Sequence, residues 1–155
     1  MADSPTQKMG WMLETTVFVC GALVMIYEII GSRIVSPFIG TSTYVWTSLI
    51  GVILGALSLG YWIGGTMADK KPKASILASA IFSAGALVSL TILTRDPILA
   101  LIAEAPIPLE VKSMLAAILL FAPASVALGF VIPYAVKLRT TSLADSGKTV
   151  GRLYA

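Results

Sequence analysis

Four long apolar stretches constrain what this chain can fold into. They cover about residues 11–30, 44–67, 74–93 and 113–136, in a chain of 155 residues of which 57% are hydrophobic and 12% charged. Each stretch is long enough to cross a hydrocarbon core of ~30 Å as an α-helix, which satisfies its own backbone hydrogen bonds in lipid. We therefore predict an all-α integral membrane protein, with a four-helix transmembrane domain in residues 1–139 embedded in the lipid bilayer.

The basic residues indicate an orientation. If both termini are cytoplasmic, eight of the eleven fall on the inner side, namely Lys8, Lys70, Lys71, Lys73, Lys137, Arg139, Lys148 and Arg152. Arg33, Arg95 and Lys112 then lie outside. Because cytoplasmic loops carry an excess of Lys and Arg, we predict this orientation in a prokaryotic cytoplasmic (inner) membrane. The net charge of +3 is thereby explained without a nucleic-acid partner.

Residues typical of helix ends and helix starts occur in the segments that connect these stretches. Gly31 followed by Ser32 predicts the end of the first helix and an ordered loop up to residue 43. Asp96 followed by Pro97 is typical of a helix start, so we predict a short interfacial helix at residues 97–103. Residues 140–155 are polar and are predicted to be a cytoplasmic tail or a linker to a missing C-terminal part.

Glycines give the second stretch two small-residue faces. Gly51 and Gly55 are four residues apart, as are Gly60 and Gly64. Such spacing lets helix backbones approach closely. At 100° per residue the two pairs lie on nearly opposite sides of the helix, so we predict that this helix is central and packed on both flanks.

Two prolines interrupt the fourth stretch. Pro123 and Pro133 have no amide hydrogen, so each frees the carbonyl four residues earlier, at Leu119 and Gly129. Free carbonyls in a membrane helix are either ligands for an ion or substrate, or the by-product of a kink that shapes helix packing. Both interpretations remain open.

Glu28 is the most informative polar residue, because it lies inside the first apolar stretch. A charge at that depth needs a partner helix, a water-filled cavity or a cationic ligand. On a straight helix Glu28 and Arg33 lie about 140° apart, which prevents a good ion pair within one unbroken span. With Tyr27 and Trp46 nearby, Glu28 and Arg33 form either a ligand-binding site for a cation or a structural ion pair between helices.

The loop between the second and third stretches holds a second charged group. Asp69, Lys70 and Lys73 lie close to two helix ends and are predicted to clamp them together. The alternative is that the basic residues only set the topology.

The sequence disfavours nucleophilic catalysis and zinc sites. It has no histidine and one cysteine, Cys20, and no carboxylate cluster has the spacing of metal ligands. We predict no catalytic residue, no metal site and no cofactor in this chain.

The same loop resembles a signature of the major facilitator superfamily, which Gly65, Asp69, Lys70 and Lys73 match and from which Pro72 and Ala74 depart. A broader set of residues resembles the membrane domain of spermidine synthase-like proteins, of the fused facilitator/spermidine synthase type. The matching segments are residues 28–33, 36–42, 45–48, 59–65, 69, 129–134 and 150–154.

This resemblance implies a facilitator-like N-terminal bundle. In that family the membrane domain continues into further helices and a cytoplasmic aminopropyltransferase-like domain, which this sequence does not contain. The implied function is a membrane module, non-catalytic by itself, that recognises or passes a polyamine or related cation together with a protein partner or as a homo-oligomer. Two alternatives are a half-transporter that acts as an oligomer and a structural membrane anchor or subunit of a larger complex.

Overall fold

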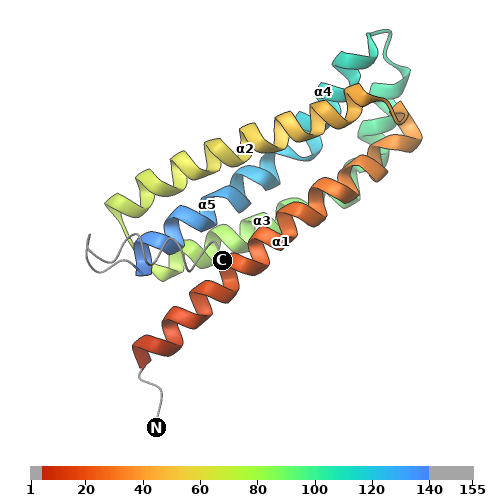
Figure 1. Cartoon of the computed structure of the whole chain (residues 1–155). Helices are drawn as coiled ribbons and strands as arrows, with labels where there is room; N and C mark the ends of the chain where they lie inside the picture. The colour runs from red at the N-terminus through yellow and green to blue at the C-terminus, as the bar shows by residue number, and fades with distance from the viewer. Residues whose placement is uncertain (1–4, 140–155) are drawn as a thin grey trace.

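A computed structural model describes the backbone of residues 5–139 and the side chains of residues 11–139. The predicted tail at residues 140–155 lies outside this range. The described chain forms five helices: α1 (Pro5–Ile39), α2 (Thr43–Lys70), α3 (Ala74–Glu104), α4 (Leu109–Leu120) and α5 (Ala122–Arg139). Figure 1 shows long helices running side by side, with α5 between α2 and the pair α1 and α3.

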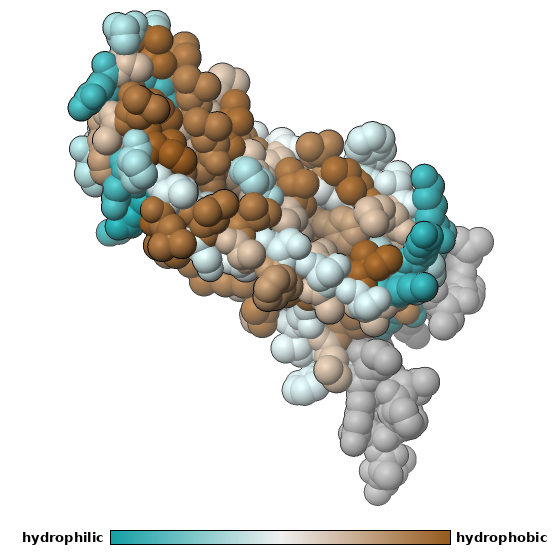
Figure 2. Space-filling model, turned by 180° about the vertical axis from the view of Figure 1, so that it is seen from behind, coloured by the Kyte–Doolittle hydropathy of each residue, from teal (hydrophilic) through white to brown (hydrophobic). Residues whose placement is uncertain are grey.

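The helices have the length and composition of membrane spans. Within the described residues, α1, α2 and α3 are each long and apolar enough to cross a bilayer, and α4 with α5 forms a fourth crossing if the bent pair is one span. Large apolar side chains such as Phe18, Phe82 and Leu93 are more than 70% exposed. Figure 2 shows hydrophobic residues over the middle of the molecule and hydrophilic residues near its two ends. The prediction of an all-α integral membrane protein is confirmed.

The first helix is longer than predicted. It does not end at Gly31 but continues to Ile39, where Gly40 takes the left-handed conformation with φ at 100°. Gly31 instead meets the ring of Phe121, because a Cβ built on Gly31 would lie 2.8 Å from Phe121 Cε1. The glycine that looked like a helix end is therefore a packing residue.

The third helix is also longer than predicted. Residues 97–103, expected as a separate interfacial helix, are the last turns of α3. Pro97 removes one amide donor without ending the helix. Leu99 and Ile102 are 0% and 7% exposed, so the packing of these turns into the core explains why the helix continues beyond Pro97.

The centre of the bundle is α5, not α2. It contacts α1, α2 and α3. The contact with α2 is close because glycines meet backbone: a Cβ on Gly64 would lie 2.5 Å from the Phe130 carbonyl oxygen, and one on Gly129 would lie 2.6 Å from that of Leu57. Gly60 and Gly64 thus pack as predicted.

The other glycine face of α2 has no neighbour in the described chain. Gly51 and Gly55 are exposed, and a Cβ built on either would meet nothing within 4 Å. The prediction that both flanks of α2 are packed is therefore wrong for the chain alone. Gly60 instead meets the backbone of α5, and Ile53 belongs to the same buried cluster as Ala116 of α4, so these two helices lie against the opposite side of α2.

The two glycine faces should respond differently to one added methyl group. We expect Gly64→Ala to lower the free energy of unfolding by ~1–3 kcal/mol, because the methyl overlaps the α5 backbone. Gly51→Ala in the same helix should leave it nearly unchanged. Unfolding of both variants in mixed micelles, followed by circular dichroism, measures the difference. Equal effects at the two positions would contradict the packing described.

Candidate functional site

The fourth span is broken where α4 meets α5, at Phe121. The two helices differ in direction by 52°, and Pro123 follows as the second residue of α5. Phe121 still donates its amide to Ala117 at 2.9 Å and accepts from Ser125 at 3.1 Å. In a bilayer the carbonyls at such a break must find donors inside the protein. The break therefore needs partners from other helices.

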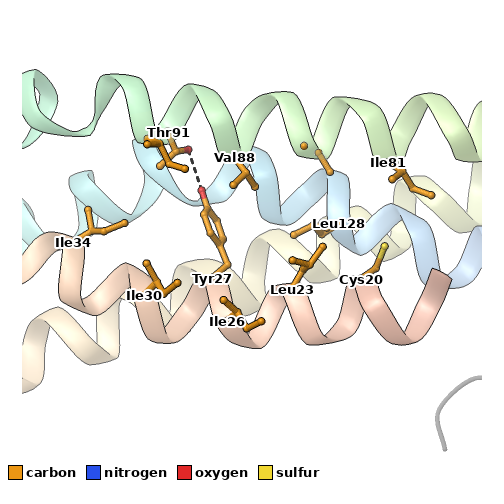
Figure 3. Close-up of a pocket in the computed structure, with 13 residues that line it drawn as sticks. Cys20, Leu23, Ile26, Tyr27, Ile30, Ile34, Ile81, Val88, Thr91 and Leu128 are labelled. Atoms are coloured by element: carbon orange, nitrogen blue, oxygen red, sulfur yellow. Dashed lines mark hydrogen bonds between the residues drawn. The ribbon is translucent and has the colours of Figure 1, made fainter. Parts of the chain in front are cut away.

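Two hydroxyl groups supply those partners. The Tyr27 hydroxyl donates to the Leu120 carbonyl oxygen at 3.0 Å, and the Thr91 hydroxyl donates to the same oxygen at 2.8 Å. The two hydroxyl oxygens are 3.0 Å apart (Figure 3). A carbonyl has two lone pairs, so it can accept both bonds. One oxygen thus joins α1, α3 and the end of α4.

Aromatic packing holds Tyr27 in this position. Its ring lies 5.1 Å from that of Phe121, centroid to centroid, at an interplanar angle of 57°. Phe121 is fully buried and fits against Gly31, one turn beyond Tyr27. Tyr27 and Thr91 are 8% and 5% exposed. The hydroxyl pair is therefore a buried element of the fold rather than a surface feature.

Beside this pair runs an apolar groove between α1 and α3, with a volume of about 350 Å³. Its residues come mainly from these two helices, with Leu128 from α5 (Figure 3). They are Cys20, Leu23, Ile26, Tyr27, Ile30, Ile34, Ile81, Ala84, Gly85, Val88, Thr91, Ile92 and Leu128. One of them, Tyr27, was predicted as a site residue.

Of the four residues predicted to form a site together, Glu28 included, Tyr27 alone is among the lining residues of the groove. Glu28 is half-buried and does not line the groove, while Arg33 and Trp46 are exposed. Neither Glu28 nor Arg33 forms an ion pair within residues 11–139. The Tyr27 hydroxyl is bonded to the Leu120 carbonyl at the helix break.

The charged loop at the opposite end of the bundle is clamped, but through α5. Asp69 forms an ion pair with Lys137, with 2.7 Å between Oδ1 and Nζ, and this pair joins the ends of α2 and α5. Glu14 and Arg139 form a second ion pair that joins α1 to α5. Among the described residues Lys70 and Lys73 have no side-chain ion pair. The clamp predicted for Asp69 therefore involves a different cation from the predicted ones.

Tyr134 is a further part of this clamp and was not predicted from the sequence. Its fully buried side chain accepts the Lys73 amide at 3.0 Å and donates to the Lys71 carbonyl. Tyr134 thus ties the α2–α3 loop to α5. It follows Pro133, through which α5 continues without ending. A tyrosine at the basic end of a span usually indicates an interface anchor, and that signal does not reveal the loop contact.

No protein-family model, curated protein or solved structure matches this chain. Within the described residues, no group of three or more His, Cys, Asp or Glu side chains could hold a metal ion. The fold is that of an all-α integral membrane protein. In it, α1 and α3 are hydrogen-bonded to the end of α4, where the fourth span is broken.

Because both hydroxyls bond to one carbonyl, the stability costs of removing them should not be additive. We expect Tyr27→Phe and Thr91→Val each to cost ~0.5–1.5 kcal/mol of stability, because the other hydroxyl still serves the Leu120 oxygen. The double variant should cost more than the sum, since it leaves that buried oxygen without either donor. A double-mutant cycle of unfolding free energies in micelles measures this. Additive costs would mean that the two bonds are independent.

Proposed function

We propose that this chain is a non-catalytic membrane module that works by associating with further membrane helices, and that the outer face of α2 makes that association. We define the outer face as Gly51, Gly55 and Ser58. The observation that carries the proposal is the open space above Gly51 and Gly55.

The outer face has the properties of a helix-packing surface. Its three residues are exposed, and the Ser58 hydroxyl is bonded to the Leu54 carbonyl of its own helix at 2.9 Å. In lipid, apolar side chains gain little by leaving a solvent of similar polarity, so helices associate where small residues let backbones approach. Gly60 and Gly64 already pack in this way inside the chain. The outer face offers the same geometry to another helix.

The resemblance to the membrane domain of spermidine synthase-like proteins supports this proposal, because that domain is followed by further membrane helices. A half-transporter would need the same association, since four spans enclose no pathway by themselves. A structural subunit would need it as well. The three functions share the interface and differ in whether a ligand binds.

We further propose an orientation in a prokaryotic cytoplasmic (inner) membrane. The end of the bundle that carries Asp69 also carries Lys70, Lys71, Lys73, Lys137 and Arg139. This excess of basic residues supports placing that end, and with it both termini, in the cytoplasm.

Cysteine cross-linking tests the proposed interface. In a Cys20→Ser background, we expect Ser58→Cys to form a disulfide-linked product in native membranes. The partner is a second copy of the chain or another membrane protein that has a cysteine at the contact. Ser83→Cys on α3 is the matched control, because Ser83 is also exposed and its hydroxyl is also bonded within its own helix, to Ser79 at 2.8 Å. Denaturing gels under non-reducing conditions reveal the product.

Adding Gly55→Leu to Ser58→Cys should abolish that product, since the larger side chain fills the open space that the partner would occupy. The chain itself should still fold, because a Cβ at Gly55 meets no atom within 4 Å. Equal cross-linking at Ser58 and Ser83, or cross-linking that survives Gly55→Leu, would overturn the proposed interface.

A second proposed function, recognition of a polyamine, rests on Glu28. Its carboxyl group lies within a membrane-spanning helix and has no ion-pair partner among residues 11–139. A carboxylate in such a position needs a cationic partner or access to water. A polyamine ammonium group would supply that charge, as the family resemblance implies.

Glu28→Gln tests this role without changing the size of the side chain. We expect the full chain in nanodiscs to bind spermidine and the variant to bind it at least about tenfold more weakly, which corresponds to ~1.4 kcal/mol. Glu104→Gln, at an exposed carboxylate at the end of α3, should bind like the wild type. Isothermal titration calorimetry measures the affinities. Unchanged binding by Glu28→Gln, or no binding by the wild type, would remove the polyamine role and leave the helix-association proposal intact.

A further inference from the structure

We propose that the groove between α1 and α3 is a binding site for one acyl chain of a bilayer phospholipid. The groove is independent of the outer face of α2 and of Glu28, which does not line it. The inference rests on the shape of the groove, on the chemistry of its walls and on the solvent that its mouth faces.

The groove has a buried floor and an open rim. On the floor, Cys20, Ala84 and Leu128 are at most 5% exposed. On the rim, Ile30 and Ile92 are 46% and 55% exposed. Both helices are candidate membrane spans, so the mouth opens on the hydrocarbon of the bilayer. Figure 3 shows the aliphatic side chains of the rim and floor lying between the two helices.

The dimensions suit an extended hydrocarbon chain. At 1.5 Å per residue, the lining extends ~21 Å along α1, from Cys20 to Ile34, and ~16 Å along α3, from Ile81 to Ile92. One leaflet of a hydrocarbon core is about 15 Å deep. A volume of about 350 Å³ spread over that length is a narrow channel. An α-helix with its side chains is ~10–12 Å across, so only side chains of such a helix, and not its backbone, would enter the channel.

Small residues on α3 create the space. Ala84 lies on the floor, and a Cβ built on Gly85 would meet nothing within 4 Å. Most of the other lining residues, including Ile81 and Val88, are branched and aliphatic. A glycine within a helix gives up stability relative to alanine, and here it leaves room beside α1.

The walls of the groove are almost entirely apolar. The Tyr27 and Thr91 hydroxyls already bond to the Leu120 carbonyl, and no charged residue lines the groove. Cys20 is a buried free thiol and behaves as a small hydrophobe. A polar ligand would lose its hydrogen bonds on entry, whereas a hydrocarbon chain would lose none. The phospholipid headgroup therefore stays outside the groove, at the membrane surface.

A photoreactive phospholipid tests the proposal. The full chain is reconstituted in nanodiscs containing phosphatidylcholine with a diazirine near the middle of one acyl chain, irradiated and mapped by mass spectrometry of its peptides. We expect adducts to concentrate on the groove residues of α1 and α3. Gly85→Leu, which fills the groove, should reduce them several-fold, while Ala86→Leu, an exposed neighbour outside the groove, should not.

A second variant guards against a folding defect in the first. Ile30→Trp places a bulky side chain on the exposed rim and should also reduce the adducts, with thermal unfolding confirming that both variants are folded. Adducts spread evenly over the exposed surfaces of α1, α2 and α3, or adducts unchanged by both variants, would overturn the proposal. So would a disulfide-linked dimer formed by Ile30→Cys in a Cys20→Ser background, because a second copy would then occupy the groove.

Discussion

The structure depends on one rule of the bilayer, that a backbone carbonyl in the hydrocarbon core must find a donor inside the protein. The break at Phe121 creates that demand, and Tyr27 and Thr91 meet it at the Leu120 oxygen. Because the two donors come from α1 and α3, satisfying the break also fixes the position of these helices against the fourth span. The break in one helix is thus the point at which hydrogen bonds hold α1, α3 and α4 together.

The overall class could be predicted from the sequence because it depends on local properties. The length of an apolar stretch and its lack of charge do not depend on distant residues. The helix ends were less predictable. Gly31 has the residue type of a helix end, but its role is set by Phe121, which reaches it only in the folded chain. Pro97 has the residue type of a helix start, but the burial of Leu99 and Ile102 explains the continuation of α3.

The site was predictable only in outline. Pro123 correctly indicated a disturbed span, but the carbonyl that accepts bonds from other helices is that of Leu120, next to the predicted Leu119. Tyr27 was named as a neighbour of Glu28, whereas its hydroxyl serves the helix break. Asp69 was named as a clamp, and its partner Lys137 lies on a helix that is distant in sequence. In each case the residue was informative, but its partner depended on tertiary packing.

Tyr27 also restricts rotation of α1 about its own axis. Its hydroxyl and its ring both contact the break, so α1 cannot turn about its own axis without losing the bond to Leu120 and the contact with Phe121. Glu28, the next residue, is held ~100° away from that direction. The direction in which α1 presents its carboxylate is therefore set by a neighbouring hydroxyl, and any motion that swings Glu28 toward a new partner must first release the broken helix.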